Sequence, residues 1–275
     1  MRNNLLKNKV VAIIGASSGI GYYTAEKLLH EGYSVYNLSR TKANYCRYCE
    51  PRHENLCCDV MDGDEIRRAI NTIVREEGRI DALVYSAGCS LAAPLEHTTE
   101  QDFRRVFEVN YFGLIKALWE VIPIMREQRE GRIVAISSMA GSFPVPFDAP
   151  YSASKAAIDI TIRTLAVELK PFNIRLSSVS PGGVSTGFTF KRKIYQEDDV
   201  GEYHTALDKA ATRLANIEQS GLDPRTVADS IAHILSMKNP PVMANIGLSN
   251  KALKLVNRVL PTGAADALNR MVYRQ

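Results

Sequence analysis

The sequence has no apolar run long enough to cross a bilayer, and its start, Met-Arg-Asn-Asn, lacks the apolar core of a signal peptide. We therefore expect a cytoplasmic protein with no membrane partner. It also has no block of basic residues, and its net charge is only +4, so we expect no nucleic acid partner. The five cysteines are an odd number crowded into one third of the chain, which is not a disulfide framework for this length.

What the sequence does contain is ordinary for a globular protein, with 45% hydrophobic and 23% charged residues. A chain of 275 residues is long enough to bury a sizeable core. No linker, internal repeat or low-complexity segment divides it. We therefore expect residues 1–275 to form a single domain.

Short apolar runs rich in β-branched residues alternate with helical patterns along most of the chain. We expect strands at residues 9–14, 34–38, 55–59, 82–85, 132–137 and 174–179. We expect helices at residues 22–30, 64–76, 151–170 and 224–237, and a long one from a cap at Thr98 or Thr99 to about Arg126. Repeated strand–helix units predict an α/β fold, a doubly wound parallel sheet with helices on both faces.

A tyrosine and a lysine, Tyr151 and Lys155, stand four residues apart at the start of one of these helices. That spacing places both on the same helix face, one turn from each other. An ammonium close to a phenol favours the phenolate, so we expect a pKa of Tyr151 below its usual value of about 10. Tyr151 is therefore a candidate general acid/base for a carbonyl or an alcohol.

Three glycines, Gly15, Gly19 and Gly21, lie between the first expected strand and the first expected helix. Such a turn lets the backbone approach a pyrophosphate, and the helix N-terminus then meets the anion with free N–H groups. The alternative is a glycine-rich turn with no ligand. The strand–turn–helix context favours a dinucleotide site.

The ordered set of motifs resembles the short-chain dehydrogenase/reductase family from about residue 8 to residue 237. The matching segments are Gly15-Ala-Ser-Ser-Gly19-Ile-Gly21, Asp59-Val60, Tyr85-Ser-Ala87-Gly88, Val-Asn110-Tyr-Phe-Gly113, Ser138, Tyr151-Ser-Ala-Ser-Lys155 and Pro181-Gly182-Gly-Val184-Ser-Thr186. Two places depart from the family pattern: Ile14 replaces a threonine, and Tyr85 and Ser86 replace two asparagines. The resemblance implies a Rossmann-type fold and hydride transfer between a nicotinamide and a carbonyl or alcohol.

The resemblance also implies a catalytic tetrad. Tyr151 exchanges a proton with the substrate oxygen, and Ser138 hydrogen-bonds that oxygen. Lys155 holds the nicotinamide ribose hydroxyls, and Asn110 holds a water that links Lys155 to solvent. Singly, each of these residues has a structural alternative, such as ending a strand or satisfying a buried backbone group. Their joint spacing favours the catalytic interpretation.

The end of the second expected strand decides between the two nicotinamide cofactors. An NAD enzyme usually places a carboxylate there, whereas this chain has Ser39-Arg40-Thr41-Lys42. Arginine offers a planar fork suited to a 2′-phosphate, which favours NADP(H); the alternative is that Arg40 is a solvated surface charge. The expected cofactor contacts are Gly15, Ser17, Ser18, Gly19, Ile20, Gly21, Arg40, Asp59, Val60, Ala87, Gly88, Asn110, Tyr151, Lys155, Pro181, Gly182, Val184 and Thr186.

Residues 182–223 are polar and mixed, with aromatic residues spaced through them, and we expect a variable substrate-binding or lid segment there. The expected pocket walls, near residues 89–91, 140–147 and 183–190, are rich in apolar side chains. They favour a hydrophobic, steroid-like or other lipophilic, ketone or alcohol. The segments around residues 143–147 and 222–224 look similar to the hydroxysteroid and retinol dehydrogenase branch of the family.

Cys46, Cys49, His53 and Cys57 follow a spacing that zinc could use. The expected strand at residues 55–59 takes in Cys57, and the resemblance predicts no metal here. We therefore expect free thiols.

The leading hypothesis is an NADP(H)-dependent reductase or dehydrogenase acting on a small-molecule carbonyl or alcohol. One alternative is a nucleotide-binding sensor or scaffold that has lost catalysis. Another is a sugar-nucleotide epimerase or dehydratase, for which the chain leaves little room beyond residue 224. The resemblance further implies a homodimer or homotetramer formed through the helices at residues 99–126 and 151–170.

Overall fold

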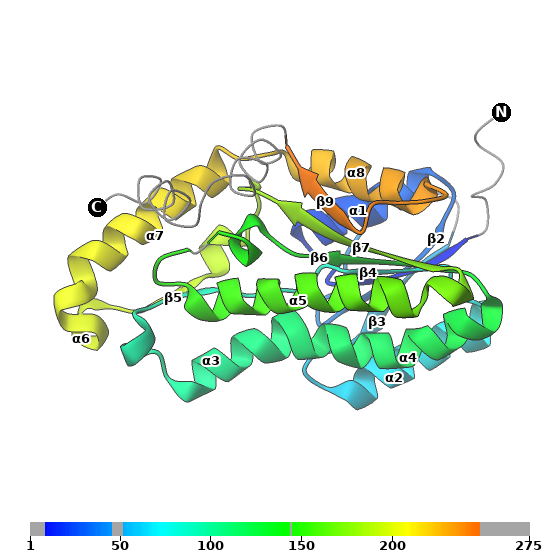
Figure 1. The fold of residues 1–275 in the computed structure, drawn as a ribbon, viewed down its shortest axis with the longest axis horizontal. Coiled ribbons are helices and arrows are strands. Elements are labelled where there is room, and N and C mark those ends of the chain that lie inside the picture. Colours follow the sequence, from blue (N-terminus) through cyan, green and yellow to red (C-terminus); the bar gives the residue numbers. More distant parts are fainter. Residues whose placement is uncertain (1–8, 46–51, 144, 248–275) are drawn as a thin grey trace.

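The computed structural model describes residues 9–45, 52–143 and 145–247 of the chain, and its centre is a parallel sheet (Figure 1). Seven strands pair in the order β3-β2-β1-β4-β6-β7-β9, each parallel to its neighbours. They are β1 (Val10–Ile14), β2 (Ser34–Ser39), β3 (His53–Cys57), β4 (Ala82–Tyr85), β6 (Gly131–Ile136), β7 (Ile174–Pro181) and β9 (Met243–Ile246). The strand order reverses between β1 and β4, which is where doubly wound sheets open a crevice.

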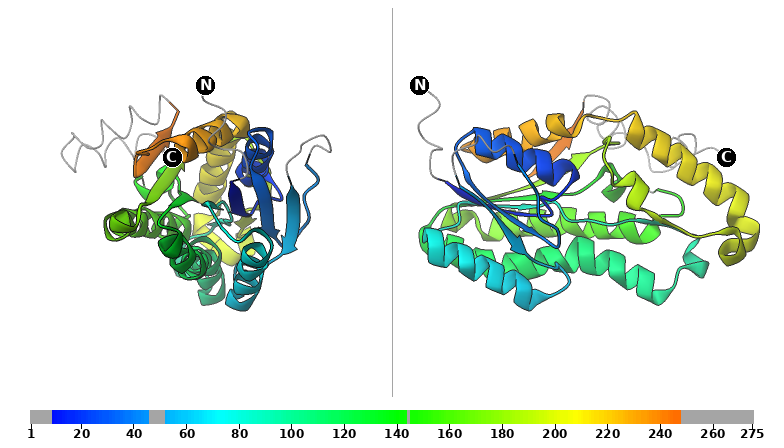
Figure 2. Two further views of the ribbon diagram at one scale, coloured as in Figure 1. Left: turned by 90° about the vertical axis from the view of Figure 1, so that its right-hand side faces the viewer. Right: turned by 180° about the vertical axis from the view of Figure 1, so that it is seen from behind.

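Helices cover both faces of this sheet, with α1 and α8 on one side and α2, α4 and α5 on the other (Figures 1 and 2). The helices are α1 (Gly19–His30), α2 (Gly63–Glu77), α3 (Glu100–Phe107), α4 (Gly113–Gln128), α5 (Ala149–Glu168), α6 (Glu197–Val200), α7 (His204–Gln219) and α8 (Pro224–Ser236). The predicted doubly wound α/β architecture is confirmed.

The first strand shows why the predicted strands are continuous apolar runs. Val10, Ala12 and Ile14 contribute to the core beneath one face of the sheet, whereas Val11 and Ile13 contribute to the core on the other face. Successive side chains of a strand point to opposite faces, so a strand covered on both sides needs apolar residues at every position.

The long helix predicted to run to about Arg126 is interrupted. Thr99 caps its start, and its hydroxyl accepts a hydrogen bond from the Asp102 N–H at 3.1 Å, as predicted. Residues Glu108–Phe112 then form a π-helical turn between α3 and α4. The Tyr85 hydroxyl donates to the Val109 carbonyl inside this turn, and a Cβ at Gly113 would lie only 2.3 Å from that hydroxyl. The buried Tyr85 hydroxyl therefore packs tightly against the helix at the turn that carries Asn110.

The segment after β7 is more regular than its sequence predicted. It contains α6, α7 and a short strand β8 (Lys193–Ile194), which pairs with a second short strand, β5 (Leu91–Ala92). Neither short strand was predicted, nor was β9. Helix α7 buries only Leu207 and Ala211. The strand predicted at residues 55–59 begins and ends two residues earlier, at His53–Cys57.

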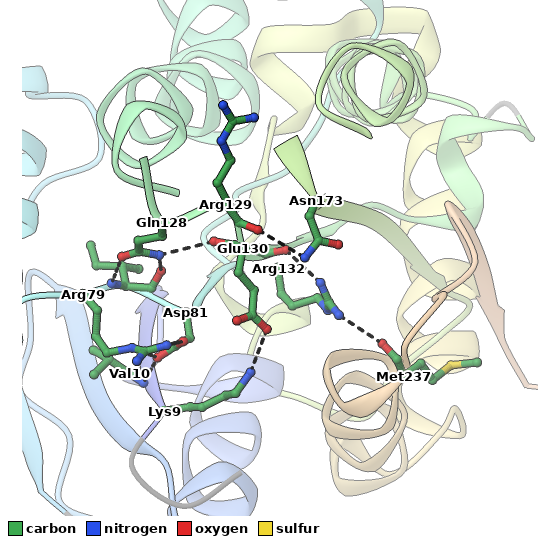
Figure 3. A network of polar contacts seen from close by, with 12 residues as sticks. Lys9, Val10, Arg79, Asp81, Gln128, Arg129, Glu130, Arg132, Asn173 and Met237 are labelled. Atoms are coloured by element: carbon green, nitrogen blue, oxygen red, sulfur yellow. Dashed lines mark hydrogen bonds and ion pairs between the residues drawn. The ribbon is translucent and has the colours of Figure 1, made fainter. Parts of the chain in front are cut away.

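A polar network closes the amino ends of the strands, at the edge of the sheet opposite the cavity described below (Figure 3). Asp81 accepts a hydrogen bond from the Val10 N–H at 2.7 Å and pairs with Arg79. Nearby, Lys9 pairs with Glu130 at 3.1 Å. These contacts tie the starts of neighbouring strands together. Within the described ranges, no helix has both the length and the apolar character needed to span a bilayer.

Candidate active site

A cavity of about 600 Å³ opens at the carboxyl ends of β1, β2, β4, β6 and β7. It lies where the strand order reverses, which is where open α/β sheets bind ligands, and its size suits a small molecule. Of the residues predicted to bind or react, all but Gly21 and Asn110 line this cavity. Those two lie directly behind its wall.

The glycine turn forms one end of the cavity, between β1 and α1. Gly15 and Gly19 have φ values of +87° and +59°, which side chains rarely adopt. A Cβ at Gly15 would lie 2.6 Å from the Ala87 nitrogen, and one at Gly21 would lie 2.3 Å from the Gly15 oxygen. Glycine is therefore required for the backbone to pack this tightly at the start of a helix. Such a bare backbone beside free N–H groups fits a pyrophosphate.

The serine at the start of α1 supports the same interpretation. Ser18 occupies the N-cap position, yet its side chain does not cap the helix. Its hydroxyl instead accepts a hydrogen bond from Lys191 Nζ at 3.5 Å. The turn therefore has a lysine from the segment after β7 beside it.

The end of β2 supplies an exposed arginine and no carboxylate. Ser39, Arg40 and Thr41 all line the cavity. Across from them, Asp59 and Val60 follow β3 and also line it. The Asp59 Oδ1 atom accepts from the Met61 N–H at 2.9 Å, which fixes the carboxylate at the rim.

Asn110 is fully buried and bridges two parts of the site. Its Nδ2 donates to the Cys89 carbonyl at 3.0 Å and to the Ser154 hydroxyl at 2.9 Å, and its Oδ1 accepts from the Cys89 N–H at 2.8 Å. Both amide donors are thus used inside the protein. The side chain holds the loop after β4 against α5, and its predicted role in binding a water stays a prediction.

Ser138, Tyr151 and Lys155 lie close together in the wall of the cavity. Ser138 follows β6, accepts a hydrogen bond from the Ala140 N–H at 3.1 Å and hydrogen-bonds Tyr151. Lys155 lies one turn after Tyr151 on α5, with its Nζ 5.5 Å from the tyrosine ring centroid. The same Nζ donates to the Ile136 carbonyl at 2.8 Å, so the buried ammonium is fixed in place.

The predicted lowering of the tyrosine pKa is wrong for this arrangement. Burial raises the pKa of Tyr151 above its usual value, and the hydrogen bond with Ser138 offsets this only in part. Lys155 lies against the ring, and burial lowers its own pKa to about 8. Desolvation therefore outweighs the attraction that the sequence argument relied on.

The loop after β7 forms the wall next to the glycine turn. Pro181, Gly182, Val184 and Thr186 all line the cavity. The Thr186 hydroxyl accepts from the Phe188 N–H at 3.2 Å, and its methyl group lies 3.7 Å from the position of a Cβ at Gly19. The loop and the turn therefore lie close together on this side of the cavity.

Sequence reasoning missed several charged residues of this cavity. Lys191, Arg192 and Glu218 come from the segment after β7, where no motif marks them. Asp148 lies three residues before Tyr151, and this position was the only feature of the sequence that could have marked it as a residue of the site. Only the folded chain brings these groups together.

The metal hypothesis concerned Cys46, Cys49, His53 and Cys57, of which the first two lie outside the described residues. Among the residues that are described, no three histidine, cysteine or acidic side chains are grouped so as to hold a metal ion. Cys57 and Cys58 are free thiols, and Cys58 lines the cavity.

The sheet, the glycine turn and the crevice define a dinucleotide-binding α/β protein. Comparison with known proteins narrows this class. The family model for short chain dehydrogenases matches residues 9–196. The chain is 33% identical over 243 residues to 3-ketodihydrosphingosine reductase of Bacteroides thetaiotaomicron, covering 88% of this chain and 89% of that protein.

Two further matches extend over nearly the whole chain. Retinol dehydrogenase 8 of Homo sapiens is 28% identical over 287 residues, which cover 97% of this chain and 91% of that protein. The crystal structure of a short-chain dehydrogenase from Streptomyces avermitilis is 29% identical and superposes with a TM-score of 0.79, covering 97% and 96% of the two chains. The chain therefore belongs to the short-chain dehydrogenase/reductase family, as its motifs predicted, and it is an oxidoreductase of the kind that uses a nicotinamide dinucleotide.

Proposed function

We propose that this protein is an NADP(H)-dependent reductase of lipophilic ketones in which Tyr151 donates the proton. The observation that carries the proposal is that one cavity brings together the glycine turn, Arg40 and the group formed by Ser138, Tyr151 and Lys155. These are the parts that bind a phosphorylated dinucleotide and those that handle a carbonyl oxygen.

The chemistry follows from the positions of these side chains. The reduced nicotinamide, when bound, supplies the hydride. The Tyr151 phenol donates its proton to the carbonyl oxygen, and Ser138 hydrogen-bonds the same oxygen as negative charge develops on it. The Lys155 ammonium has three N–H donors and uses one on the Ile136 carbonyl, which leaves donors for the ribose hydroxyls. The raised pKa of Tyr151 keeps the phenol protonated, which is the form that ketone reduction needs.

The preference for NADP(H) rests on the charges around the cavity rim. Arg40 follows β2, where NAD enzymes use a carboxylate. Its guanidinium can donate two parallel hydrogen bonds to the oxygens of a 2′-phosphate. Lys191 adds a second positive charge beside Ser18 at the glycine turn. Both favour the cofactor with the additional phosphate.

A lipophilic substrate suits the rest of the wall. The apolar residues that line the cavity include Phe143, Val145, Phe188, Leu214 and Ile217. A bulky apolar group of the substrate would be removed from water when it binds against them. Two relatives are named as enzymes of 3-ketodihydrosphingosine and of retinol, which supports a lipid-like ketone or alcohol. We assign residues 182–223, which supply three of these five side chains, to substrate binding.

The proposal is tested by NADPH consumption with a panel of lipophilic carbonyl compounds, including the ketone 3-ketodihydrosphingosine and the aldehyde all-trans-retinal. We expect substrate-dependent oxidation of NADPH by at least one lipophilic ketone. Tight NADPH binding with no consumption across the panel would contradict a reductase and favour the alternative of a nucleotide-binding sensor.

The glycine turn gives a prediction of its own. We expect Gly21→Ala to destabilise the protein by about 1–3 kcal/mol, because the added methyl group would lie 2.3 Å from the Gly15 oxygen. NADPH affinity should fall with it. Urea unfolding and NADPH titration measure the two effects. Gly63→Ala is the matched control, since its methyl would meet only the Lys116 side chain, at 3.8 Å; equal stability of both variants would contradict the packing argument.

We also infer that α4 and α5 form the interface of a homodimer or homotetramer. The two helices run alongside each other on the same side of the sheet (Figure 1). Large apolar side chains on them remain exposed: Trp119 (68%), Ile160 (56%) and Val167 (74%). Packing these side chains against a second copy of the chain would remove their apolar surface from water.

This inference predicts the effect of a charge at the centre of α4. We expect Trp119→Glu to reduce the native mass to that of one chain, measured by size-exclusion chromatography with light scattering. Leu95→Glu, at an equally apolar and exposed position (60%) in the turn before α3, should leave the mass unchanged. A wild-type protein that is already monomeric would contradict the inference.

A further inference from the structure

A cluster of polar side chains borders the cavity, which three of them, Asp148, Arg192 and Glu218, line. The proposed reaction does not use this cluster. Ser90 and Asp148 are buried and bonded, with the Ser90 hydroxyl donating to Asp148 Oδ2 at 2.6 Å. Arg192 Nε donates to the Ser90 oxygen at 3.0 Å, and Arg192 Nη2 pairs with Glu218 at 2.5 Å. Thr189 donates to the other Glu218 oxygen at 2.7 Å. We call these five residues the carboxylate cluster.

The charges of the carboxylate cluster do not balance when both of its acids are ionised. It contains two carboxylates and one guanidinium, and the guanidinium pairs directly with Glu218 rather than with Asp148. Asp148 Oδ1 is buried and has no hydrogen-bond partner in the part of the chain that the structure describes. A buried carboxylate oxygen without a partner is costly unless something else completes its bonding.

The position of Asp148 in the fold adds a second argument. It is the residue before α5, and an aspartate at an N-cap usually accepts hydrogen bonds from the first turn of the helix. Here the side chain makes no cap hydrogen bond and reaches the buried Ser90 instead. Asp148 lines the cavity, whereas Ser90 lies behind it. The carboxylate thus gives up the stabilising bond that its position offers. The Ser90 hydroxyl takes up Oδ2, and it is Oδ1 that stays without a partner among the described residues.

The carboxylate cluster also lies close to the reacting hydroxyl. The charges of Asp148 and Glu218 raise the pKa of Tyr151, and the charge of Arg192 lowers it. Burial raises the pKa of Asp148 to about 7, and Ser90, Arg192 and the nearby Leu91 N–H offset this only in part. A positive charge next to these carboxylates would stabilise the ionised form of Asp148 and remove their effect on the tyrosine.

We propose that the cavity binds a ketone that carries a protonated amine near its carbonyl group, with Asp148 as the partner of the ammonium. This assignment rests on the proposed reductase function and narrows its substrate class. The ammonium completes the bonding of Asp148 and balances the second carboxylate. The remainder of the substrate packs on the apolar walls formed by Phe143, Leu214 and Ile217. The substrate is therefore an amphiphilic amino ketone rather than a purely apolar one.

The experiment compares two ketones of the same length, 2-aminododecan-3-one and dodecan-3-one, in the wild-type protein and in Asp148→Asn. We expect the wild type to prefer the amino ketone by about 10- to 100-fold in kcat/KM, as for a hydrogen bond between charged groups. In Asp148→Asn this ratio should fall to near one. Asp208→Asn removes the same charge from an exposed position on α7 and should keep the ratio. A wild type without the preference, or a ratio that Asp148→Asn leaves unchanged, would overturn the proposal.

Binding without turnover separates this proposal from the proposed function. Dodecylamine and dodecan-1-ol are titrated calorimetrically into the wild-type protein with NADPH present. If neither ketone is reduced but dodecylamine binds at least tenfold more tightly and loses this advantage in Asp148→Asn, the amine site stands and the reductase function fails. Equal binding of the amine and the alcohol by the wild type overturns the amine site, and this comparison does not depend on the folding of any variant.

Discussion

Replacing Tyr151 with phenylalanine is expected to lower ketone reduction by about 10²- to 10⁴-fold, the usual contribution of a general acid. The change removes the hydroxyl that donates the proton and hydrogen-bonds Ser138. It keeps the ring, which packs against Phe188 with 6.0 Å between the ring centroids. Steady-state kinetics give kcat, and a fluorescence titration with NADPH gives the Kd, which we expect to change by less than about threefold because the ring fills the same space.

A matched tyrosine separates loss of the acid from loss of any hydroxyl. Tyr23 on α1 lies outside the cavity, where Arg225 stacks on its ring at 4.8 Å from the centroid. Tyr23→Phe should retain full activity. Activity of Tyr151→Phe within a few-fold of the wild type would remove the mechanism. A parallel loss of NADPH affinity would instead assign Tyr151 to cofactor binding.

The second large effect concerns cofactor choice. Arg40→Asp is expected to reverse the preference for NADPH over NADH, lowering the ratio of the two kcat/KM values by about 10- to 150-fold. A hydrogen bond to a charged group contributes about 1.5–3 kcal/mol, and the new carboxylate would also repel the 2′-phosphate. Kinetics with each cofactor at a saturating ketone concentration measure the ratio.

The control for this change places the same substitution elsewhere. Arg68 is exposed on α2 and does not line the cavity, so Arg68→Asp should leave the ratio unchanged. If Arg40→Asp also leaves it unchanged, Arg40 is a solvated surface charge and the phosphate assignment is wrong. The presence of Lys191 near the glycine turn allows some NADPH affinity to survive in the variant.

The parts of the site that the sequence predicted are those set by local spacing. The glycine turn needs residues without Cβ at fixed positions between a strand and a helix, and the structure has them in that place with φ values of +87° at Gly15 and +59° at Gly19. The four-residue spacing of Tyr151 and Lys155 puts both on one helix face. These features depend on neighbours in sequence, so a single sequence contains them.

The parts that the sequence could not predict depend on long-range packing. Arg192 lies more than a hundred residues from Ser90 along the chain, yet its Nε bonds the Ser90 hydroxyl at 3.0 Å. The hydrogen bond from Tyr85 to the Val109 carbonyl in the π-helical turn likewise joins distant segments. The direction of the Tyr151 pKa was wrong because burial, which spacing does not show, outweighs the nearby ammonium.

Direct transfer of hydrogen from cofactor to substrate is the most direct test of this account. The wild-type protein is incubated with a ketone that it reduces and with NADPH carrying deuterium at the carbon that gives up hydride, each face being labelled in turn. We predict that one of the two labelled forms passes its deuterium to the carbinol carbon of the product. Product that carries no deuterium from either form would contradict hydride transfer in this cavity.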